Sequence, residues 1–320
     1  MENLKEGDGD TYVDLKEIER TSGGGVKTSH MRMILEALAN FHGAWMVWMR
    51  KGGDIGDMTR SQMMKFFGHH HKIFKGKWLW KSFIKKTMSY YIVLADTKNM
   101  QSTKERIQAF IDSPQSVGRI MMSFLYKNSK FKTMTHSDLW TSQIMFSLYE
   151  DGKFDYLIYW QFKIIAHILN ILTHTHITGT PKRVKILDYQ ALTWGHPARD
   201  IWSIVYSCTD AQYRKDHMEE DLRAYFAVLS GYMDIEVDYT EFRQELEDRR
   251  PFGMVQYGIF PIMTLSPKKL PNPLTDSQKF GRACKEILRA EETEKDHPDL
   301  KEIRRRMMSN LKEMEDINLI

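Results

Sequence analysis

Apolar residues recur at steps of three and four positions along the segment that begins at Thr28. The series consists of Met31, Ile34, Leu35, Leu38, Phe41 and Trp45, with His42 on the same face. This spacing places the side chains on one stripe of an α-helix, where they can pack against a core. The pair Gly52-Gly53 follows and favours a helix end. The pattern predicts a long amphipathic helix after Thr28, with His42 as a hydrogen-bonded core histidine.

Helical spacing also dominates most of the remaining chain. The predicted segments are 59–93, 103–126 with a break at Asp112-Ser113-Pro114, Arg199 to Ser207, Glu219 to Tyr232, and a closing helix from Pro298. Residues 5–29 are polar and glycine-rich, which predicts a loop. In the closing helix, Leu300, Ile303, Met307, Leu311 and Met314 form one apolar stripe. The run Arg304-Arg305-Arg306 lies off that stripe, so we predict a solvated face for it.

The hydrophobic period changes from helical to two at Ile144. Ile144, Phe146 and Leu148 alternate with other residues, and Glu150-Asp151-Gly152 is a strong turn signal. A returning strand is expected directly after this turn. The next β-like run, however, comes only at Val184 and Ile186. Loops of this length are uncommon inside a compact domain. We therefore interpret 154–180 as an insertion at the tip of a hairpin.

Composition indicates a cytoplasmic protein with an ordinary core. The chain has 320 residues, is 42% hydrophobic and carries a formal net charge of +4, with a pI near 8.8. Basic and acidic residues alternate throughout, so the mild basicity does not indicate a nucleic-acid partner. Cys208 and Cys284 lie far apart, which is typical of reduced thiols. Met1 to Asp10 is acidic and polar, unlike a signal peptide.

One apolar stretch, Tyr156 to Leu172, requires a check as a membrane span. It is shorter than the roughly 20 residues that a bilayer requires. It also contains Gln161, Lys163 and His167. We therefore expect no membrane association.

Two short segments carry candidate chemistry. The first reads His136-Ser137-Asp138 and continues to Gln143, and the second is the apolar run that ends in Asp188-Tyr189-Gln190. Kinase-type phosphotransfer needs one carboxylate to accept a hydroxyl proton, and an amide and a second carboxylate to hold Mg²⁺. Asp138 suits the first role, with His136 packed beneath it to fix its direction. Asp188 and Gln143 suit the second.

The simpler alternative is that two aspartates near strand ends only cap turns. Either motif alone fits that alternative as well as it fits a catalytic site. Both motifs occur in the expected order, with Trp140 and Ile144-Met145-Phe146 between them. This combination favours a phosphotransferase site.

These motifs resemble the ecdysteroid kinase-like family, relatives of the choline and aminoglycoside kinases. The family's His-Gly-Asp-Leu-Trp-x-x-Asn-Ile-Met-Phe loop is similar to His136 to Phe146, and its Asp-Phe/Tyr-Gln is similar to Asp188 to Gln190. Its Pro-Ala-x-Asp segment is similar to Pro197 to Asp200, and its Leu-Ala-x-Phe-His helix to Leu38 to His42. The resemblance covers nearly all of the chain except 154–180.

The resemblance implies an α+β, mainly α, fold: the C-terminal helical lobe of a protein-kinase-like fold, with a small β-hairpin at the active site. It implies ATP-dependent phosphate transfer to the hydroxyl of a small molecule, with an ecdysteroid-like alcohol as the best candidate and Mg²⁺ as cofactor. By the resemblance, Asp138 is the catalytic base and Asp188 a magnesium ligand. Asp200 would be a structural residue that braces the catalytic loop.

The sequence departs from the family pattern at three places. Ser137 replaces a glycine, which matters if the backbone there has a positive φ. Gln143 replaces an asparagine. The glutamine stem is longer by one methylene, which predicts weaker metal binding. Glu2-Asn3-Leu4 is similar to the hinge Glu-Asp-Leu, so residues 1–320 are expected to be a C-terminal lobe that starts at the hinge. The glycine-rich loop and ATP-contacting lysine precede that hinge in the family. We therefore expect impaired catalysis, with a non-catalytic binding or scaffolding module as the alternative.

Overall fold

The computed structural model describes residues 11–15, 28–51, 77–125, 129–148, 154–155, 184–267, 269–271, 276–289 and 297–320. Helices dominate, as predicted. They are α2 (Thr28–Arg50), α5 (Lys77–Thr97), α6 (Gln101–Asp112), α7 (Pro114–Leu125), α9 (Ala198–Cys208), α10 (Ala211–Ser230), α11 (Tyr239–Tyr257), α12 (Phe260–Leu265), α13 (Ser277–Arg289) and α14 (Pro298–Asp316). The strands are β1 (Thr11–Asp14), β2 (Thr133–Thr135), β3 (Ile144–Leu148), β4 (Phe154–Asp155), β5 (Val184–Ile186) and β6 (Thr193–Gly195).

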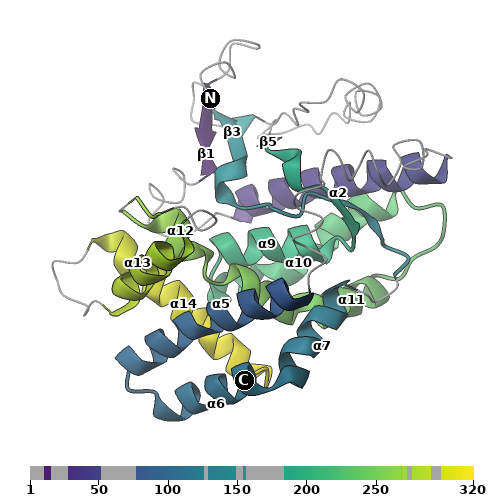
Figure 1. The fold of residues 1–320 in the computed structure, drawn as a ribbon. Coiled ribbons are helices and arrows are strands. Elements are labelled where there is room, and N and C mark those ends of the chain that lie inside the picture. The colour runs from purple at the N-terminus through teal and green to yellow at the C-terminus, as the bar shows by residue number, and fades with distance from the viewer. Residues whose placement is uncertain are drawn as a thin grey trace.

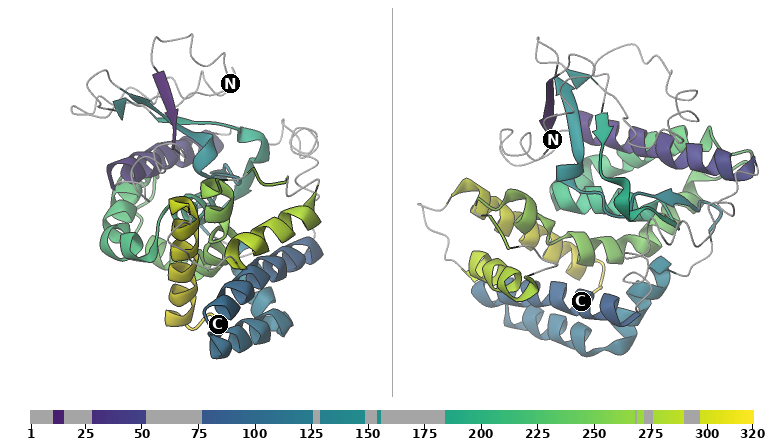
Figure 2. Two further views of the ribbon diagram at one scale, coloured as in Figure 1. Left: turned by 90° about the vertical axis from the view of Figure 1, so that its left-hand side faces the viewer. Right: turned by 45° about the horizontal axis from the view of Figure 1, so that its top comes forward.

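The small sheet lies at one end of the molecule, and the C-terminus lies at the other (Figure 1). Helices α2, α9 and α10 lie directly beneath the sheet, and α5, α6, α7 and α14 form the far end (Figures 1 and 2). The predicted face of α2 is buried: Met31, Ile34, Leu35 and Leu38 have no exposed surface. The mainly α architecture with small antiparallel sheets confirms the predicted fold class at this level.

Strand β3 is the centre of the main sheet. It pairs antiparallel with β5, with Ile144 opposite Ile186, which confirms the pairing that the sequence predicts. It also pairs with β4, so that Ser147 faces Asp155 while Phe146 faces Val184. Asp155 and Val184 thus occupy neighbouring positions along one edge of β3.

The returning strand therefore begins at Phe154, directly after the turn. Phe154 and Asp155 are the first two residues of the segment interpreted as an insertion, 154–180, and they are strand residues. The predicted insertion 154–180 therefore includes two residues of the returning strand. Residues 156–183, including Tyr156 to Leu172, lie outside the described part of the chain.

The prediction of a loop over 5–29 is wrong at Thr11–Asp14. This segment is strand β1, which pairs antiparallel with the other edge of β3, with Val13 opposite Phe146. Backbone hydrogen bonds to β3 define it, and its sequence has two adjacent apolar residues, Tyr12 and Val13, instead of the alternation that predicts a half-buried strand. The residue that follows, Leu15, is fully buried.

The closing helix α14 begins at Pro298, as predicted, and buries Ile303, Met307, Leu311 and Met314 completely. The prediction of a solvated arginine face is wrong for two of the three arginines. Arg304 is buried and donates from Nε to the carbonyl oxygen of Ile287 at 3.3 Å. Arg306 is buried and donates to Glu302 at 2.7 Å. Neighbouring helices cover a wider arc of α14 than its apolar stripe, so only Arg305 is solvated.

The described helices include none with a stretch both long and apolar enough to cross a bilayer. The break predicted at Asp112-Ser113-Pro114 is confirmed, because α6 ends at Asp112 and α7 begins at Pro114. Helix α10 begins eight residues before the predicted Glu219, at Ala211. Its start is fixed by Asp210, whose carboxylate accepts a hydrogen bond from the Tyr213 N–H at 2.8 Å.

Candidate active site

Strand β2 leads into the loop that contains His136, Ser137 and Asp138. The carboxylate of Asp200, in the first turn of α9, accepts the backbone N–H of His136 at 2.6 Å and that of Ser137 at 2.7 Å. Each carboxylate oxygen therefore fixes one peptide group of the loop. Asp200 has no exposed surface, so these hydrogen bonds form away from competing water.

The Asp200 carboxylate also contacts His42 of α2. The His42 Nε2 lies 3.0 Å from Asp200 Oδ2, and its Nδ1 lies 2.7 Å from the hydroxyl of Tyr225 in α10. Burial alone would raise the pKa of Asp200, but the hydrogen bond and charge of His42, together with the Ser137 N–H, hold that pKa below its ordinary value. The network stabilises the ionised form of Asp200. His42 is a hydrogen-bonded core residue, as predicted.

His136 connects the loop to the segment after β5. Its Nδ1 lies 3.4 Å from the backbone nitrogen of Asp138, and its Nε2 lies 2.8 Å from the carbonyl oxygen of Leu187. A carbonyl only accepts, so Nε2 carries the proton and Nδ1 accepts the Asp138 N–H. The ring is fully buried and packs against Tyr189, with centroids 5.0 Å apart. His136 thus links the backbone of Asp138 to that of Leu187, the residue before Asp188.

Leu187 is held at both of its backbone groups. Its N–H donates to the Gln143 carbonyl oxygen at 2.8 Å, while its own carbonyl contacts His136. Asp188 follows at once and is exposed. Its backbone has φ 65° and ψ 59°, in the left-handed region. A fixed neighbour and a defined backbone conformation together aim this carboxylate.

Asp138 lies half-buried beside Asp188. Burial raises the pKa of Asp138, the negative charge of Asp188 adds to the rise, and His136, a hydrogen bond from Gln143 and the charge of Arg199 oppose it. The charge of Asp188 thus acts on Asp138, and His136 hydrogen-bonds to the carbonyl oxygen of Leu187, the residue that precedes Asp188. The structure therefore brings Asp138, Asp188, His136 and Gln143 together, with Asp200 beneath them.

Gln143 is oriented by two neighbours. Its side-chain oxygen accepts the N–H of Trp140 at 3.3 Å, and its side chain hydrogen-bonds to Asp138. The side chain is buried. In this orientation the amide group holds the carboxylate of Asp138, and its oxygen retains one lone pair for a further ligand.

Ser137 has φ 71°, the positive value that favours glycine. A serine here is strained, at a cost of roughly 1–2 kcal/mol relative to an ordinary backbone region. Its hydroxyl offsets part of this cost through hydrogen bonds to Thr135 at 2.8 Å and Thr193 at 2.5 Å. The sequence comparison with the family's glycine indicated this position, but not its new partners.

The donor set suits Mg²⁺, although the described residues contain no group of three or more metal-binding side chains. Mg²⁺ commonly binds one or two carboxylates together with phosphate oxygens and waters, and does not need an all-protein cage. The exposed carboxylate of Asp188, with the neighbouring Asp138 and the amide oxygen of Gln143, provides hard oxygen ligands of this kind.

Sequence reasoning did not find Tyr225, Thr193 or Arg199 as parts of this site. Tyr225 lies 183 positions from His42, which it contacts. Arg199 occupies the variable position of the Pro-Ala-x-Asp segment, so the motif gave no reason to select it. Only the packing of β6, α9 and α10 reveals these partners.

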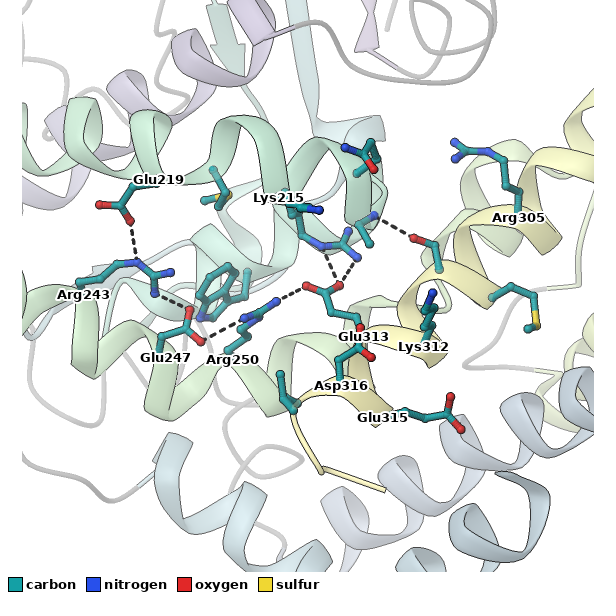
Figure 3. A pocket seen from close by; sticks show the side chains of 18 of the residues that line it. Lys215, Glu219, Arg243, Glu247, Arg250, Arg305, Lys312, Glu313, Glu315 and Asp316 are labelled. Carbon is teal, nitrogen blue, oxygen red and sulfur yellow. Dashed lines mark hydrogen bonds and ion pairs between the residues drawn. The ribbon is translucent and has the colours of Figure 1, made fainter. Parts of the chain in front are cut away.

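A charged crevice of about 960 Å³ lies elsewhere, between α10, α11 and α14 (Figure 3). None of the residues that line it belongs to the candidate active site. Its side chains form a chain of ion pairs in which Glu219, Arg243, Glu247, Arg250 and Glu313 alternate in charge. The charges neutralise each other, so the crevice gives no indication of a reactive centre.

Comparison with known proteins identifies one family. The model of the ecdysteroid kinase-like family matches residues 16–166 and 166–235, which together make up more than half of the chain. The matched residues include the Asp138 loop, the Asp188 segment and the first turn of α9. No curated protein and no solved structure matches the chain. The family match covers the segments that build the site, and the chain belongs to the ecdysteroid kinase-like family.

Proposed function

We propose that this protein transfers the γ-phosphoryl group of ATP to the hydroxyl of a small molecule. Membership of the ecdysteroid kinase-like family supports kinase-like phosphotransfer in general. The observation that carries the proposal is the hydrogen-bonded loop of Asp138: Asp200 holds its backbone, and His136 links it to Leu187, the residue before Asp188. In this proposal, the described helices and β3–β5 hairpin correspond to the C-terminal lobe of a protein-kinase-like fold.

Asp138 is the proposed general base. The acceptor's O–H bond breaks as its proton moves to an Asp138 carboxylate oxygen, and the hydroxyl oxygen forms a bond to the γ-phosphorus. The bond from that phosphorus to the bridging oxygen breaks, and ADP leaves. Burial raises the pKa of Asp138 and so strengthens it as a base.

The remaining residues position this base and the nucleotide. His136 and Asp200 hold the loop backbone, and the Gln143 side chain fixes the carboxylate of Asp138. Asp188, with Gln143 as a second oxygen ligand, would hold Mg²⁺. When bound, Mg²⁺ neutralises charge on the phosphates and orients them.

The acceptor class follows from the family rather than from the geometry. A steroid-like alcohol, such as an ecdysteroid, is the first candidate. A panel of such alcohols and of smaller hydroxyl compounds, incubated with ATP and Mg²⁺, tests the assignment by mass spectrometry of the phosphorylated product.

Asp138→Asn tests the catalytic role. The variant keeps the size of the side chain but accepts no proton, so we expect the transfer rate to fall by about 10²- to 10⁴-fold. Asp216→Asn is the matched control, because Asp216 is exposed on α10. Equal rates in wild type and Asp138→Asn would contradict the proposal, as would a wild-type protein that phosphorylates none of the alcohols.

A second candidate function is a non-catalytic binding module. The orientation of Gln143 favours it in one respect: the side-chain oxygen that would contact metal already accepts a hydrogen bond from Trp140, which leaves a single lone pair for the metal. Such a module would bind an alcohol in a calorimeter with equal affinity in wild type and Asp138→Asn, and would release no ADP.

A further inference from the structure

Two aromatic side chains, Trp140 and Phe260, lie in contact beside the Asp138 loop. Trp140 follows Asp138 by two positions, and both residues are half-buried, whereas Leu139 between them has no exposed surface. The backbone of Trp140 is extended, with φ −153° and ψ 176°. Side chains alternate between two sides along an extended segment. Asp138 and Trp140 therefore lie on the same side of the loop, away from the core.

The position of the Trp140 indole is defined by the loop and by Phe260. The Trp140 N–H donates to Gln143 Oε1 at 3.3 Å, and the Trp140 carbonyl oxygen accepts the Gln143 N–H at 3.0 Å. The Trp140 and Phe260 rings lie edge to face, with centroids 6.0 Å apart. Phe260 has the same arrangement with the buried Tyr257, at 5.2 Å. Favourable aromatic geometry thus links the indole to the core.

Helix α12 adds a second apolar residue. Within α12, Phe260 and Met263 are partly exposed and the other four residues are buried. Residues three positions apart lie on one face of a helix, and exposed helix positions are usually polar. The helix packs against α9, whose Asp200 holds the Asp138 loop (Figure 1). Trp140, Phe260 and Met263 thus form a half-exposed apolar surface, here called the apolar wall.

The segments that build the apolar wall carry no charge. No charged residue occurs from position 139 to 149 or from position 251 to 267. A cationic ligand such as an amino sugar is bound most strongly by carboxylates, and these two segments provide none. A neutral ring skeleton gives up no charge solvation here and gains from the burial of apolar area.

We propose that Trp140, Phe260 and Met263 bind the carbon skeleton of the acceptor, as the specificity-determining residues for an uncharged ring alcohol. The inference rests on the proposed function, in which the acceptor hydroxyl contacts Asp138. Two residues of chain span at most about 7 Å, so an acceptor with its hydroxyl at Asp138 extends past Trp140. An apolar wall with one convergent polar group is typical of a small-molecule site. The acceptor class is that of the proposed function, and the inference adds the residues that recognise it.

Calorimetric titration of the full chain with ecdysone, in the absence of ATP, measures acceptor binding apart from transfer. Trp140→Ala should weaken ecdysone binding by about 10- to 100-fold, the effect of losing one large apolar contact. Met263→Gln keeps the length of the side chain but adds an amide, and should weaken binding by about three- to tenfold. Ile235→Ala is the control, because Ile235 is 54% exposed between α10 and α11. It should bind ecdysone as the wild type does.

Phe260→Leu and Met263→Gln keep the proposal falsifiable if Trp140→Ala fails to fold. Both changes conserve side-chain size at half-exposed positions, and thermal unfolding verifies that each variant is folded. Wild-type ecdysone affinity in both folded variants would overturn the proposal. A wild-type chain that binds no ecdysone, or that binds the cationic alcohol choline more tightly, would also overturn it.

The binding measurement is independent of turnover, so it separates this inference from the proposed function. In an active protein, Phe260→Leu should raise the KM for ecdysone more than it lowers kcat, because the apolar wall binds substrate and transition state alike. A lower kcat with an unchanged KM would count against the apolar wall. A chain that transfers no phosphate, but whose variants lose ecdysone affinity as expected, would contradict the proposed function alone.

Discussion

Two carboxylates, the buried Asp200 and the half-buried Glu313, organise different regions of this protein in different ways. Asp200 accepts two backbone N–H groups and contacts one histidine. Glu313, whose side chain is 12% exposed, binds the guanidinium groups of Arg214 and Arg250. A backbone N–H has a fixed position, whereas an arginine head lies at the end of a flexible stem. Asp200 therefore fixes a loop, and Glu313 joins helices α10, α11 and α14.

The Asp200 and Glu313 regions also differ in backbone strain. The non-glycine residues with positive φ in the described chain are Asn99, Ser137, Asp188 and Asn318. Two of them, Ser137 and Asp188, lie in the candidate active site, and none lines the Glu313 crevice. Strain of this kind persists only where the surroundings over-determine the conformation, and it is typical of functional sites. Asp200 fixes the backbone geometry of the Asp138 loop, whereas Glu313 mainly stabilises the packing of its helices.

The largest expected effect comes from Asp200→Asn. This change removes the buried charge opposite His42 and replaces one acceptor of a backbone N–H by an amide donor. We expect a loss of about 3–5 kcal/mol in the free energy of unfolding, the range for breaking a buried pair. Transfer activity should fall with it, because the Asp138 loop is no longer fixed. Urea denaturation and the transfer assay measure the two effects.

Acid denaturation sharpens this prediction. The pKa of Asp200 is lower in the folded protein than its ordinary value. Its stabilising contribution is therefore present above that ordinary value and is lost as the pH falls through the lower, folded pKa. Asp200→Asn lacks this contribution, so the stability difference from wild type should shrink in that acidic range. A difference that stays constant with pH would contradict the ionised role of Asp200.

Glu313→Gln should have a smaller effect, and on stability alone. The amide leaves Arg214, whose side chain is 4% exposed, without its charged partner. We expect about 2 kcal/mol lower stability, as for a weakened hydrogen bond to a charged group. Activity per folded molecule should stay within about twofold of wild type, a change of less than 0.5 kcal/mol in the barrier. A large loss of activity would show that the two regions are coupled.

The sequence predicted the elements that have a long, regular hydrophobic period. The α2 face, the β3–β5 pairing and the apolar stripe of α14 are all confirmed. Strand β1 was missed because pairing with β3 defines it, and the burial of Arg304 was missed because α13 covers that side of α14 through the Ile287 carbonyl. Both errors concern contacts between distant segments, which a local period does not contain.

The candidate site follows the same rule. The motif order selected His136, Asp138, Gln143, Asp188 and Asp200. Hydrogen bonds join Asp200, His136, Asp138 and Gln143, and His136 also reaches the carbonyl oxygen of Leu187, next to Asp188. Their roles in transfer stay predictions. Thr193 and Arg199 carry no motif, and their contribution depends on how β6 and α9 pack behind the loop. Residue type and order were enough to indicate the candidate reacting groups. The residues that position those groups could be identified only from the folded structure.

In the proposed function, Asp138 and Asp188 share one space with a metal-bound nucleotide. Mn²⁺ takes oxygen ligands as Mg²⁺ does and broadens nearby NMR signals by its unpaired electrons. In ¹³C-aspartate-labelled protein, addition of ATP with Mn²⁺ should broaden the carboxyl signals of Asp138 and Asp188 and leave that of Asp216 on α10 sharp. Sharp signals for both Asp138 and Asp188, or equal broadening of all three, would contradict the claim.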